Sequence, residues 1–185
     1  MRLTNIELCR MARHVAEDLP TLFVIGGYGA RLTEENKELL MNKYSYNAEP
    51  ERRERILAAD ESVYAFDCVC FIKALLWGFD GRADHPCGGA EYASNGVPDI
   101  YELPFFENCY SKSDQFTQIV PGEMLWLPGH TGIYLGEGLA AECTPRWQDK
   151  VQITAIQHPR KGYMTRRWSR HGFLPYVDYV DKTCR

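Results

Sequence analysis

The spacing of the apolar residues changes once along this 185-residue chain, close to Gly122. Before that point, apolar residues recur at intervals of three and four, as on the buried face of an amphipathic helix. After it, they alternate in short runs separated by glycine and proline, as in the strands of an antiparallel sheet. We therefore predict an α+β domain with N-terminal helices packed on an antiparallel sheet.

Four helices are predicted before the change, and capping signals set their boundaries. Thr4 and Glu7 form a capping box at the start of the first helix. The last helix is apolar around most of its circumference, which indicates a buried helix. The predicted helices cover residues 4–19, 33–43, 50–59 and 67–77.

Five strands are predicted after the change, and glycines separate two of them. Gly136, Glu137 and Gly138 are typical of a tight turn between antiparallel neighbours. Between helices and strands, residues 79–120 are rich in Gly, Pro, Asn, Asp and Ser, which predicts a loop-rich insertion with one short helix near 112–117. The predicted strands cover residues 124–127, 130–135, 139–144, 151–156 and 174–180.

Length and composition exclude several classes of protein. A chain of this size is expected to form one domain, residues 1–185, and its 45% of hydrophobic residues can bury a core. A net charge of −4 does not favour non-specific nucleic-acid binding. No run is long and apolar enough to span a membrane, and residues 1–10 lack the apolar segment of a secretory signal.

One local stretch is basic although the chain is acidic overall. We interpret it as a solvated face, and the alternative is a surface for an acidic ligand such as a carboxylate-rich polymer. Its residues are Arg160, Lys161, Arg166, Arg167 and Arg170.

The seven cysteines are an odd number at scattered positions. They lack the CxxC spacing of a zinc ribbon or a thioredoxin-type site, so free thiols are expected. Cys68 lies at the N-terminus of the predicted 67–77 helix, where unpaired N–H groups and the helix dipole favour an anion. This position is expected to lower the thiol pKa and to make Cys68 a nucleophile, and the alternative is an inert buried cysteine. The cysteines are Cys9, Cys68, Cys70, Cys87, Cys109, Cys143 and Cys184.

A thiol nucleophile needs a base, and His130 is the best placed of the five histidines. It begins a predicted strand, and the following hairpin places Glu142 on the neighbouring strand, where a carboxylate can orient the imidazole. The alternative for Glu142 is a position on the exposed face. His85 and Cys87 form at most half of a metal site, because no further ligands are evident.

Two short segments and one glutamate follow one another at defined positions along the chain. Residues 66–72 read FDCVCFI and residues 129–136 read GHTGIYLG, with Glu142 twelve positions after His130. Residues 122–126, GEMLW, resemble the strand before such a histidine segment, and residues 21–36 resemble the approach segment. Together these features resemble the NlpC/P60 family of cysteine peptidases.

The resemblance implies a papain-like fold with the nucleophile on a helix packed against an antiparallel sheet. It implies that Cys68 is the nucleophile, His130 the general base and acid, and Glu142 the orienting residue. It also implies hydrolysis of stem peptides of bacterial peptidoglycan at a D-γ-glutamyl–diamino acid bond, with no metal or other cofactor. Because no signal is evident, such an enzyme is expected in the cytoplasm or as a phage-type lysin released by other means.

The same resemblance indicates residues that contact the substrate, and some depart from the family pattern. Val69 stands where the family commonly has a serine that grips the substrate amine, and Phe23 stands where many members carry tyrosine. Tyr28 or Tyr64 is the candidate for the missing hydroxyl. The expected substrate-contacting residues are Asp67, Val69, Phe23, Tyr64 and Thr131.

Two other functions are compatible with this sequence. An amidase or acyltransferase would use the same Cys/His pair on a different bond. A catalytically silent wall-binding module is expected to have lost the nucleophile or the base, and both are present here.

Overall fold

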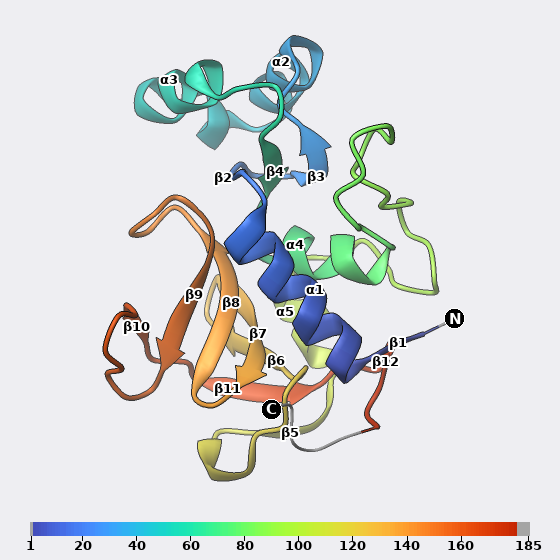
Figure 1. Ribbon diagram of the computed structural model, residues 1–185, viewed down its shortest axis with the longest axis vertical. Helices are drawn as coiled ribbons and strands as arrows, with labels where there is room; N and C mark the ends of the chain where they lie inside the picture. Colours follow the sequence, from blue (N-terminus) through green and yellow to red (C-terminus); the bar gives the residue numbers. More distant parts are fainter. Residues whose placement is uncertain (1, 181–185) are drawn as a thin grey trace.

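The computed structural model describes residues 2–180 and has the expected α+β architecture (Figure 1). Helices α1 to α4 come from the N-terminal part of the chain, and the main sheet is built from strands that follow them. The predicted α+β class is confirmed, and the order of helices first and strands second holds for the main sheet, whereas further short strands lie among the helices.

Capping chemistry sets the boundaries of the N-terminal helices. The Thr4 hydroxyl accepts the Glu7 N–H at 3.2 Å, and the Glu7 carboxylate accepts the Thr4 N–H at 2.8 Å. Thr33 caps the second helix, and Pro50 opens the third. These helices are α1 (Asn5–Asp18), α2 (Glu34–Lys43) and α3 (Pro50–Ala58), with the short 3-10 helix η1 (Ser45–Ala48) between α2 and α3.

The main sheet has seven strands in the order β10-β9-β8-β7-β6-β11-β5. Strands β6 to β9 form the predicted antiparallel meander, and β11 pairs antiparallel with the other side of β6. Strand β10 runs parallel to β9, so the sheet is mixed rather than purely antiparallel. The strands are β5 (Tyr110–Ser113), β6 (Met124–Leu127), β7 (His130–Gly136), β8 (Leu139–Thr144), β9 (Lys150–Ile156), β10 (Thr165–Arg166) and β11 (Arg170–Phe173).

A smaller sheet leads the chain into α4 (Cys68–Leu76), the helix that carries the predicted nucleophile. Its three strands lie in the order β2-β4-β3, with β2 parallel and β3 antiparallel to the central β4. The sequence pattern does not predict β4, because three buried residues are too few to show an alternation. The strands are β2 (Thr21–Phe23), β3 (Tyr28–Arg31) and β4 (Tyr64–Phe66).

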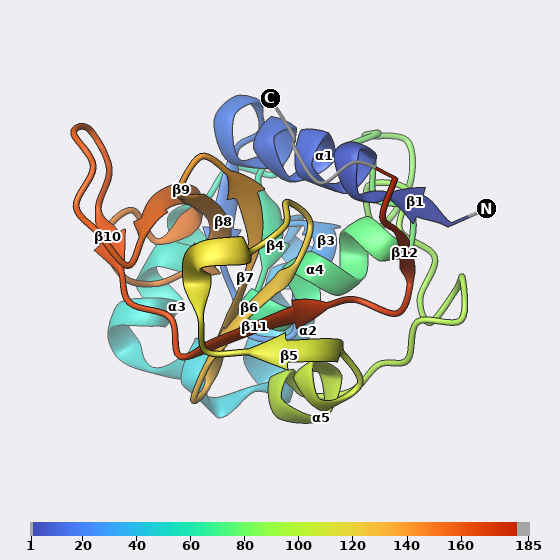
Figure 2. The same ribbon diagram turned by 90° about the horizontal axis from the view of Figure 1, so that it is seen from below.

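Helices α1 and α4 contact each other and the same strands, β7 and β8, of the main sheet. Figure 2 shows α1 along the top of the view, with α4 below it and beside the strands of the main sheet. The main core lies at this contact and includes Leu8, Phe71 and Ile133, which are fully buried. A smaller cluster that includes Tyr134 and Trp168 lies on the opposite face of the sheet. Because side chains alternate along β7, neighbouring residues of this strand reach different faces.

The 79–120 insertion differs from the prediction in two elements. Its helix is α5 (Glu102–Glu107), whereas the predicted helix at 112–117 is wrong, because this region forms β5 and the 3-10 helix η2 (Phe116–Gln118). Strand β5 reads YSKS and pairs at the edge of the sheet, so it lacks the apolar alternation on which strand prediction depends.

The first part of the insertion is packed on α4. The Trp77 indole N–H donates to the Val97 carbonyl at 2.9 Å. Lys73, which is buried on α4, forms an ion pair with Asp99. These contacts hold the insertion against the helix that carries Cys68.

The predicted strand at 174–180 is wrong in its extent. The chain instead forms β11, a turn, and the short strand β12 (Val177–Asp178), which pairs parallel with β1 (Leu3–Thr4). The Val177 N–H donates to the Leu174 carbonyl at 3.3 Å across this turn. Pro175 has no N–H to give to a strand ladder, which favours the interruption at this position.

Candidate active site

Cys68 is the first residue of α4 and follows β4 after a single residue, Asp67. The Asp67 carboxylate caps the helix, because Oδ1 accepts the Cys70 N–H at 2.7 Å and Oδ2 accepts the Gly26 N–H at 2.8 Å. The glycine turn between β2 and β3 is thereby attached to the N-terminus of α4. Cys68, Cys70, Cys87, Cys109 and Cys143 carry free thiols, and Cys184 lies outside the described residues.

The Cys68 thiol is less acidic than its position at a helix N-terminus predicts. Burial raises the pKa of Cys68 to about 12, the Asp67 charge acts in the same direction, and hydrogen bonds from Thr131 and Val69 offset only part of the rise. The expectation of a lowered pKa is therefore wrong. The capping carboxylate occupies the Cys70 N–H of the first turn and also places a negative charge beside the sulfur. Cys68 rests as a neutral thiol, so a base must remove its proton.

His130 begins β7 directly after the Pro128-Gly129 turn. Gly129 has a φ of 79°, which fits the third position of a type II turn with proline before it. The His130 Nε2 lies 2.6 Å from Oε2 of Glu142. An ionised carboxylate only accepts hydrogen bonds, so Nε2 carries a hydrogen and the lone pair of the neutral ring is on Nδ1. In this tautomer Nδ1 can accept a proton.

Glu142 lies on β8 and is completely buried. Its Oε1 accepts the Thr154 hydroxyl at 2.5 Å. Its Oε2 contacts His130 Nε2 and also lies 2.6 Å from Arg166 Nε. The alternative of an exposed Glu142 is wrong, and the contacts to both oxygens hold the carboxylate in one orientation.

Trp168 fixes the plane of the His130 ring. The two rings stack with their centroids 5.4 Å apart and their planes 11° apart. Gly132 leaves room for this stack, because a Cβ at position 132 would lie 3.0 Å from the Trp168 ring and from the Ala141 carbonyl oxygen. The second glycine of the GHTG segment therefore has a packing role beside the histidine.

Thr131 connects the nucleophile with the histidine strand. It is buried and lies on the face of β7 against which α4 packs, opposite to the face of His130. Its backbone N–H and its hydroxyl interact with the Cys68 sulfur. The hydroxyl has no hydrogen-bond partner of good geometry within residues 2–180. The sulfur thus lies at the beginning of β7, beside the residue that follows His130.

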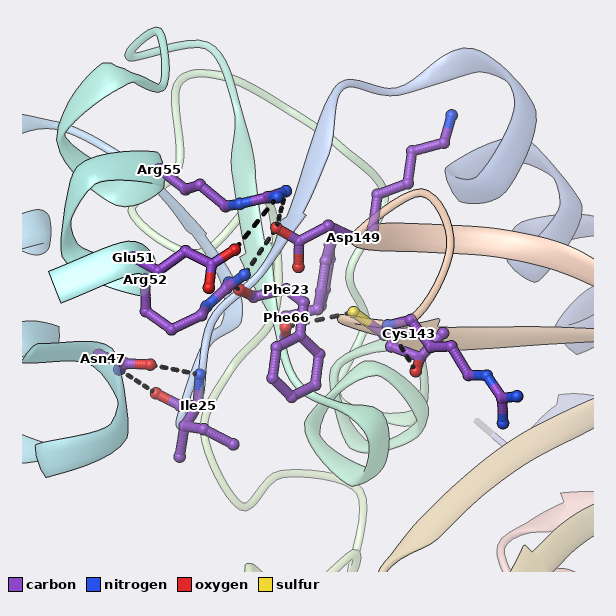
Figure 3. A network of polar contacts seen from close by, with 12 residues as sticks. Phe23, Ile25, Asn47, Glu51, Arg52, Arg55, Phe66, Cys143 and Asp149 are labelled. Atoms are coloured by element: carbon purple, nitrogen blue, oxygen red, sulfur yellow. Dashed lines mark hydrogen bonds and ion pairs between the residues drawn. The ribbon is translucent and has the colours of Figure 1, made fainter. Parts of the chain in front are cut away.

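A second set of contacts joins β8 to the strands before α4 (Figure 3). The Cys143 thiol of β8 donates to the Phe66 carbonyl of β4 at 3.2 Å. Arg52 of α3 pairs with Asp149 in the β8–β9 turn at 2.6 Å and donates to the Phe23 carbonyl of β2. These contacts fix the small sheet, and with it the start of α4, relative to the strand that carries Glu142.

Three expected substrate contacts are packed in the core. Val69 and Phe23 are buried in the main core cluster. The Tyr64 hydroxyl donates to the Gly81 carbonyl at 2.6 Å and is therefore occupied by the insertion. Tyr28, the other candidate for the missing hydroxyl, lies in an aromatic cluster where burial raises its pKa. The other two expected contacts, Asp67 and Thr131, lie beside the Cys68 sulfur.

The structure contains a second His–Glu pair that the sequence analysis missed. Nδ1 of His171 lies 2.5 Å from Oε2 of Glu123, and Nε2 lies 3.0 Å from the Gln115 carbonyl oxygen. Burial acts to lower the pKa of His171, but the hydrogen bonds to Glu123 and Gln115 outweigh it, and the pKa is raised. The partners are 48 and 56 positions away in sequence, so no local spacing signals them.

The remaining histidines are not part of such a cluster. His14 is exposed and pairs with Asp18 at 2.8 Å. His85 accepts the Cys87 N–H at 3.4 Å, and across residues 2–180 no three His, Cys, Asp or Glu side chains are arranged to hold a metal ion.

The basic stretch is only partly a solvated face. Arg160, Lys161 and Arg167 are exposed, as expected. The Arg166 side chain is only 10% exposed and lies against Glu142, so the interpretation as a solvated face is wrong for this residue.

Comparison of the sequence with known protein families and with curated proteins gives no match. Among the helices within the described residues, none has the length and hydropathy needed to cross a membrane.

Proposed function

We propose that this chain is a cysteine hydrolase of the NlpC/P60 type that cleaves stem peptides of bacterial peptidoglycan at a D-γ-glutamyl–diamino acid bond. The observation that carries the proposal is the 2.6 Å contact between His130 Nε2 and Glu142, at the end of β7 where Thr131 meets the Cys68 sulfur. A thiol, an imidazole with its lone pair on Nδ1 and a buried carboxylate supply a nucleophile, a base and an orienting group.

In the proposed reaction, Nδ1 of His130 takes the Cys68 proton as the sulfur attacks the substrate carbonyl carbon. Because burial raises the pKa of Cys68, the thiol is the resting form and the attack requires transfer of its proton to the histidine. The imidazolium then protonates the leaving amine, and the acyl group stays on sulfur as a thioester. Water, deprotonated by His130, hydrolyses the thioester and restores the thiol. Glu142 orients the ring and stabilises the imidazolium that forms in each proton transfer.

The oxyanion of the tetrahedral intermediate needs a donor, and the N–H of Cys68 is the candidate. Helix geometry leaves the first N–H groups of α4 without intrahelical partners. Asp67 uses the Cys70 N–H, whereas the Cys68 N–H belongs to the nucleophile itself and moves with it. A backbone donor at this position stabilises negative charge as it develops.

The substrate class rests on the resemblance of residues 66–72 and 129–136 to the NlpC/P60 segments. The packing of α4 against the antiparallel strands β7 and β8 supports a papain-like arrangement. Val69, which replaces the usual serine, is buried, so recognition of the substrate amine falls to other groups.

The test is mass spectrometry of defined peptidoglycan fragments incubated with the wild-type protein and with the Cys68→Ala variant. We expect a new pair of products with the wild type that is absent with Cys68→Ala. The matched control is Cys87→Ala, which removes another free, partly exposed thiol and should cleave like the wild type. The masses of the products identify the bond that is cut.

The other outcomes separate the alternative functions. A product that carries an added amine, formed in place of free acid, would indicate an acyltransferase. Retained binding of wall fragments without cleavage by the wild type would overturn the hydrolase and favour a silent binding module.

A further inference from the structure

Arg166 reaches the proposed site from β10, the strand at one edge of the main sheet. It lies on β10, which pairs parallel with β9, opposite Ile156. The Gln157 side chain anchors the returning segment, because its amide N–H donates to the Trp168 carbonyl at 2.9 Å and its oxygen accepts the Trp168 N–H at 3.0 Å. The position of Arg166 is therefore set by the fold rather than by a flexible surface loop.

The guanidinium contacts the same carboxylate oxygen as the proposed base. Arg166 Nε and His130 Nε2 each lie 2.6 Å from Oε2 of Glu142. The Arg166 N–H is not well aligned with this oxygen, so the contact is an ion pair rather than a directed hydrogen bond. The guanidinium also lies over the Trp147 ring at 4.8 Å and the Trp168 ring at 5.7 Å.

The pair His171–Glu123 shows the same chemistry without an arginine. Both nitrogens of His171 face oxygen acceptors, the Glu123 carboxylate and the Gln115 carbonyl, which favours a hydrogen on each nitrogen and raises the pKa of the ring. Within the described residues, His171 is the cation that neutralises Glu123. Glu142, in contrast, already has a permanently charged partner, Arg166.

We propose that Arg166 is a positioning residue of the active site, which balances the charge of Glu142 and so keeps His130 available to accept the Cys68 proton. This inference rests on the proposed hydrolase function. An imidazole that is already charged cannot act as a base. Arg166 acts through Glu142 and need not touch the substrate.

The charges around His130 determine the direction of the effect. Glu142 faces it from β8, and Arg166 of β10 lies against the same carboxylate, while Cys68, with Asp67 next to it in the chain, lies beside Thr131, the following residue of β7. Glu142 and Arg166 cancel, whereas removal of Arg166 leaves a buried net negative charge against the ring. That charge favours the imidazolium.

The test is NMR titration of the His130 ring in the Cys68→Ala background, which requires no catalytic activity. We expect Arg166→Gln to move the midpoint of this titration upward by about one pH unit or more. Arg166→Lys, which keeps the charge, should stay close to the parent, and so should the matched control Arg167→Gln, which removes an exposed neighbouring cation. If Arg166→Gln does not fold, Arg166→Met keeps apolar contact with the two tryptophan rings and carries the same test.

A midpoint that does not move in a folded Arg166→Gln variant would overturn the inference. With active enzyme, the acidic limb of the kcat/KM profile should move upward with the titration, whereas a purely structural role would lower the whole profile without moving the limb. Failure of the wild type to cleave any fragment would overturn the proposed function and leave the titration result intact. Cleavage combined with an unmoved midpoint would overturn the role of Arg166 alone.

Discussion

Two His–Glu pairs with buried carboxylates lie on one sheet, and the second nitrogen of each imidazole distinguishes them. His171 gives one nitrogen to Glu123 and the other to the Gln115 carbonyl, and these contacts raise the pKa of its ring. His130 gives Nε2 to Glu142 and keeps the lone pair on Nδ1. A histidine between two acceptors holds its protons, whereas a histidine with one acceptor can exchange a proton with a neighbouring group.

The carboxylates of the two pairs also differ in their partners. Glu123 uses Oε1 to accept the Val120 N–H at 2.8 Å and Oε2 to hold His171. Glu142 shares Oε2 between His130 and the Arg166 guanidinium. The His171–Glu123 pair is thus a structural ion pair. The His130–Glu142 pair has the composition of a catalytic pair, and Arg166 already balances the charge of its carboxylate.

The largest expected effect separates the two histidines. His130→Asn should lower kcat by about 10⁴-fold or more and leave the free energy of unfolding nearly unchanged, because Glu142 keeps Arg166. His171→Asn should leave kcat per folded molecule unchanged and lower the free energy of unfolding by about 3–5 kcal/mol, because Glu123 loses its buried partner. Turnover kinetics and urea denaturation of both variants measure the two effects. Equal loss of turnover in a folded His171→Asn protein would refute the division of roles.

The next effect concerns the two carboxylates. Glu142→Gln should retain the fold and lower kcat by roughly 10²- to 10⁴-fold, because the amide no longer stabilises the imidazolium. Glu123→Gln is the matched control and should weaken folding rather than turnover. Steady-state kinetics with thermal unfolding as the check on folding measure both variants. Wild-type rates in Glu142→Gln would remove Glu142 from the mechanism.

A smaller effect tests the acidity of the Cys68 thiol. Asp67→Asn should keep the helix cap and remove the charge that helps to raise the pKa of Cys68, so alkylation by iodoacetamide at pH 8 should accelerate. Each unit of pKa is worth about tenfold in thiolate. Mass spectrometry gives the rate at Cys68 and, as an internal control, at Cys87, which should not change. Equal acceleration at both positions would mean that the substitution loosened the fold.

The smallest effect is the pH dependence of stability. The raised pKa of His171 means that the folded state holds this proton more tightly than the unfolded state does. The resulting stabilisation is complete below the unfolded value of about 6.5 and is lost as the pH rises through the folded pKa. Within that window, the free energy of unfolding should fall by about 1.4 kcal/mol per pH unit in the wild type relative to His171→Asn. Urea titrations on the alkaline side of pH 6.5 measure the difference, and identical slopes in the two proteins would contradict it.

Local signals predicted the elements around the site. Strands β6 and β8 have the predicted bounds, because glycine and proline turns delimit them on the sequence. The capping box predicted α1 in the same way. The three catalytic candidates lie on elements that the sequence predicted, namely α4, β7 and β8.

Contacts between distant segments were not predictable in this way. Arg166 reaches Glu142 because β10, two residues long, pairs with β9, and such a short strand has no periodicity. His171 reaches Glu123 through the pairing of β11 with β6. The pKa of Cys68 was predicted with the wrong sign, because position on the helix says nothing about burial or about the charge of the cap.

The most direct test of this account is NMR titration of both rings, His130 and His171, in one sample of the wild-type protein, with His130→Asn and His171→Asn used for assignment. The account predicts that His171 keeps its second proton to a higher pH than His130, because His171 lies between two acceptors while Arg166 balances the charge beside His130. A His130 ring that holds its second proton to the same pH as His171, or to a higher one, would contradict its role as the base for Cys68.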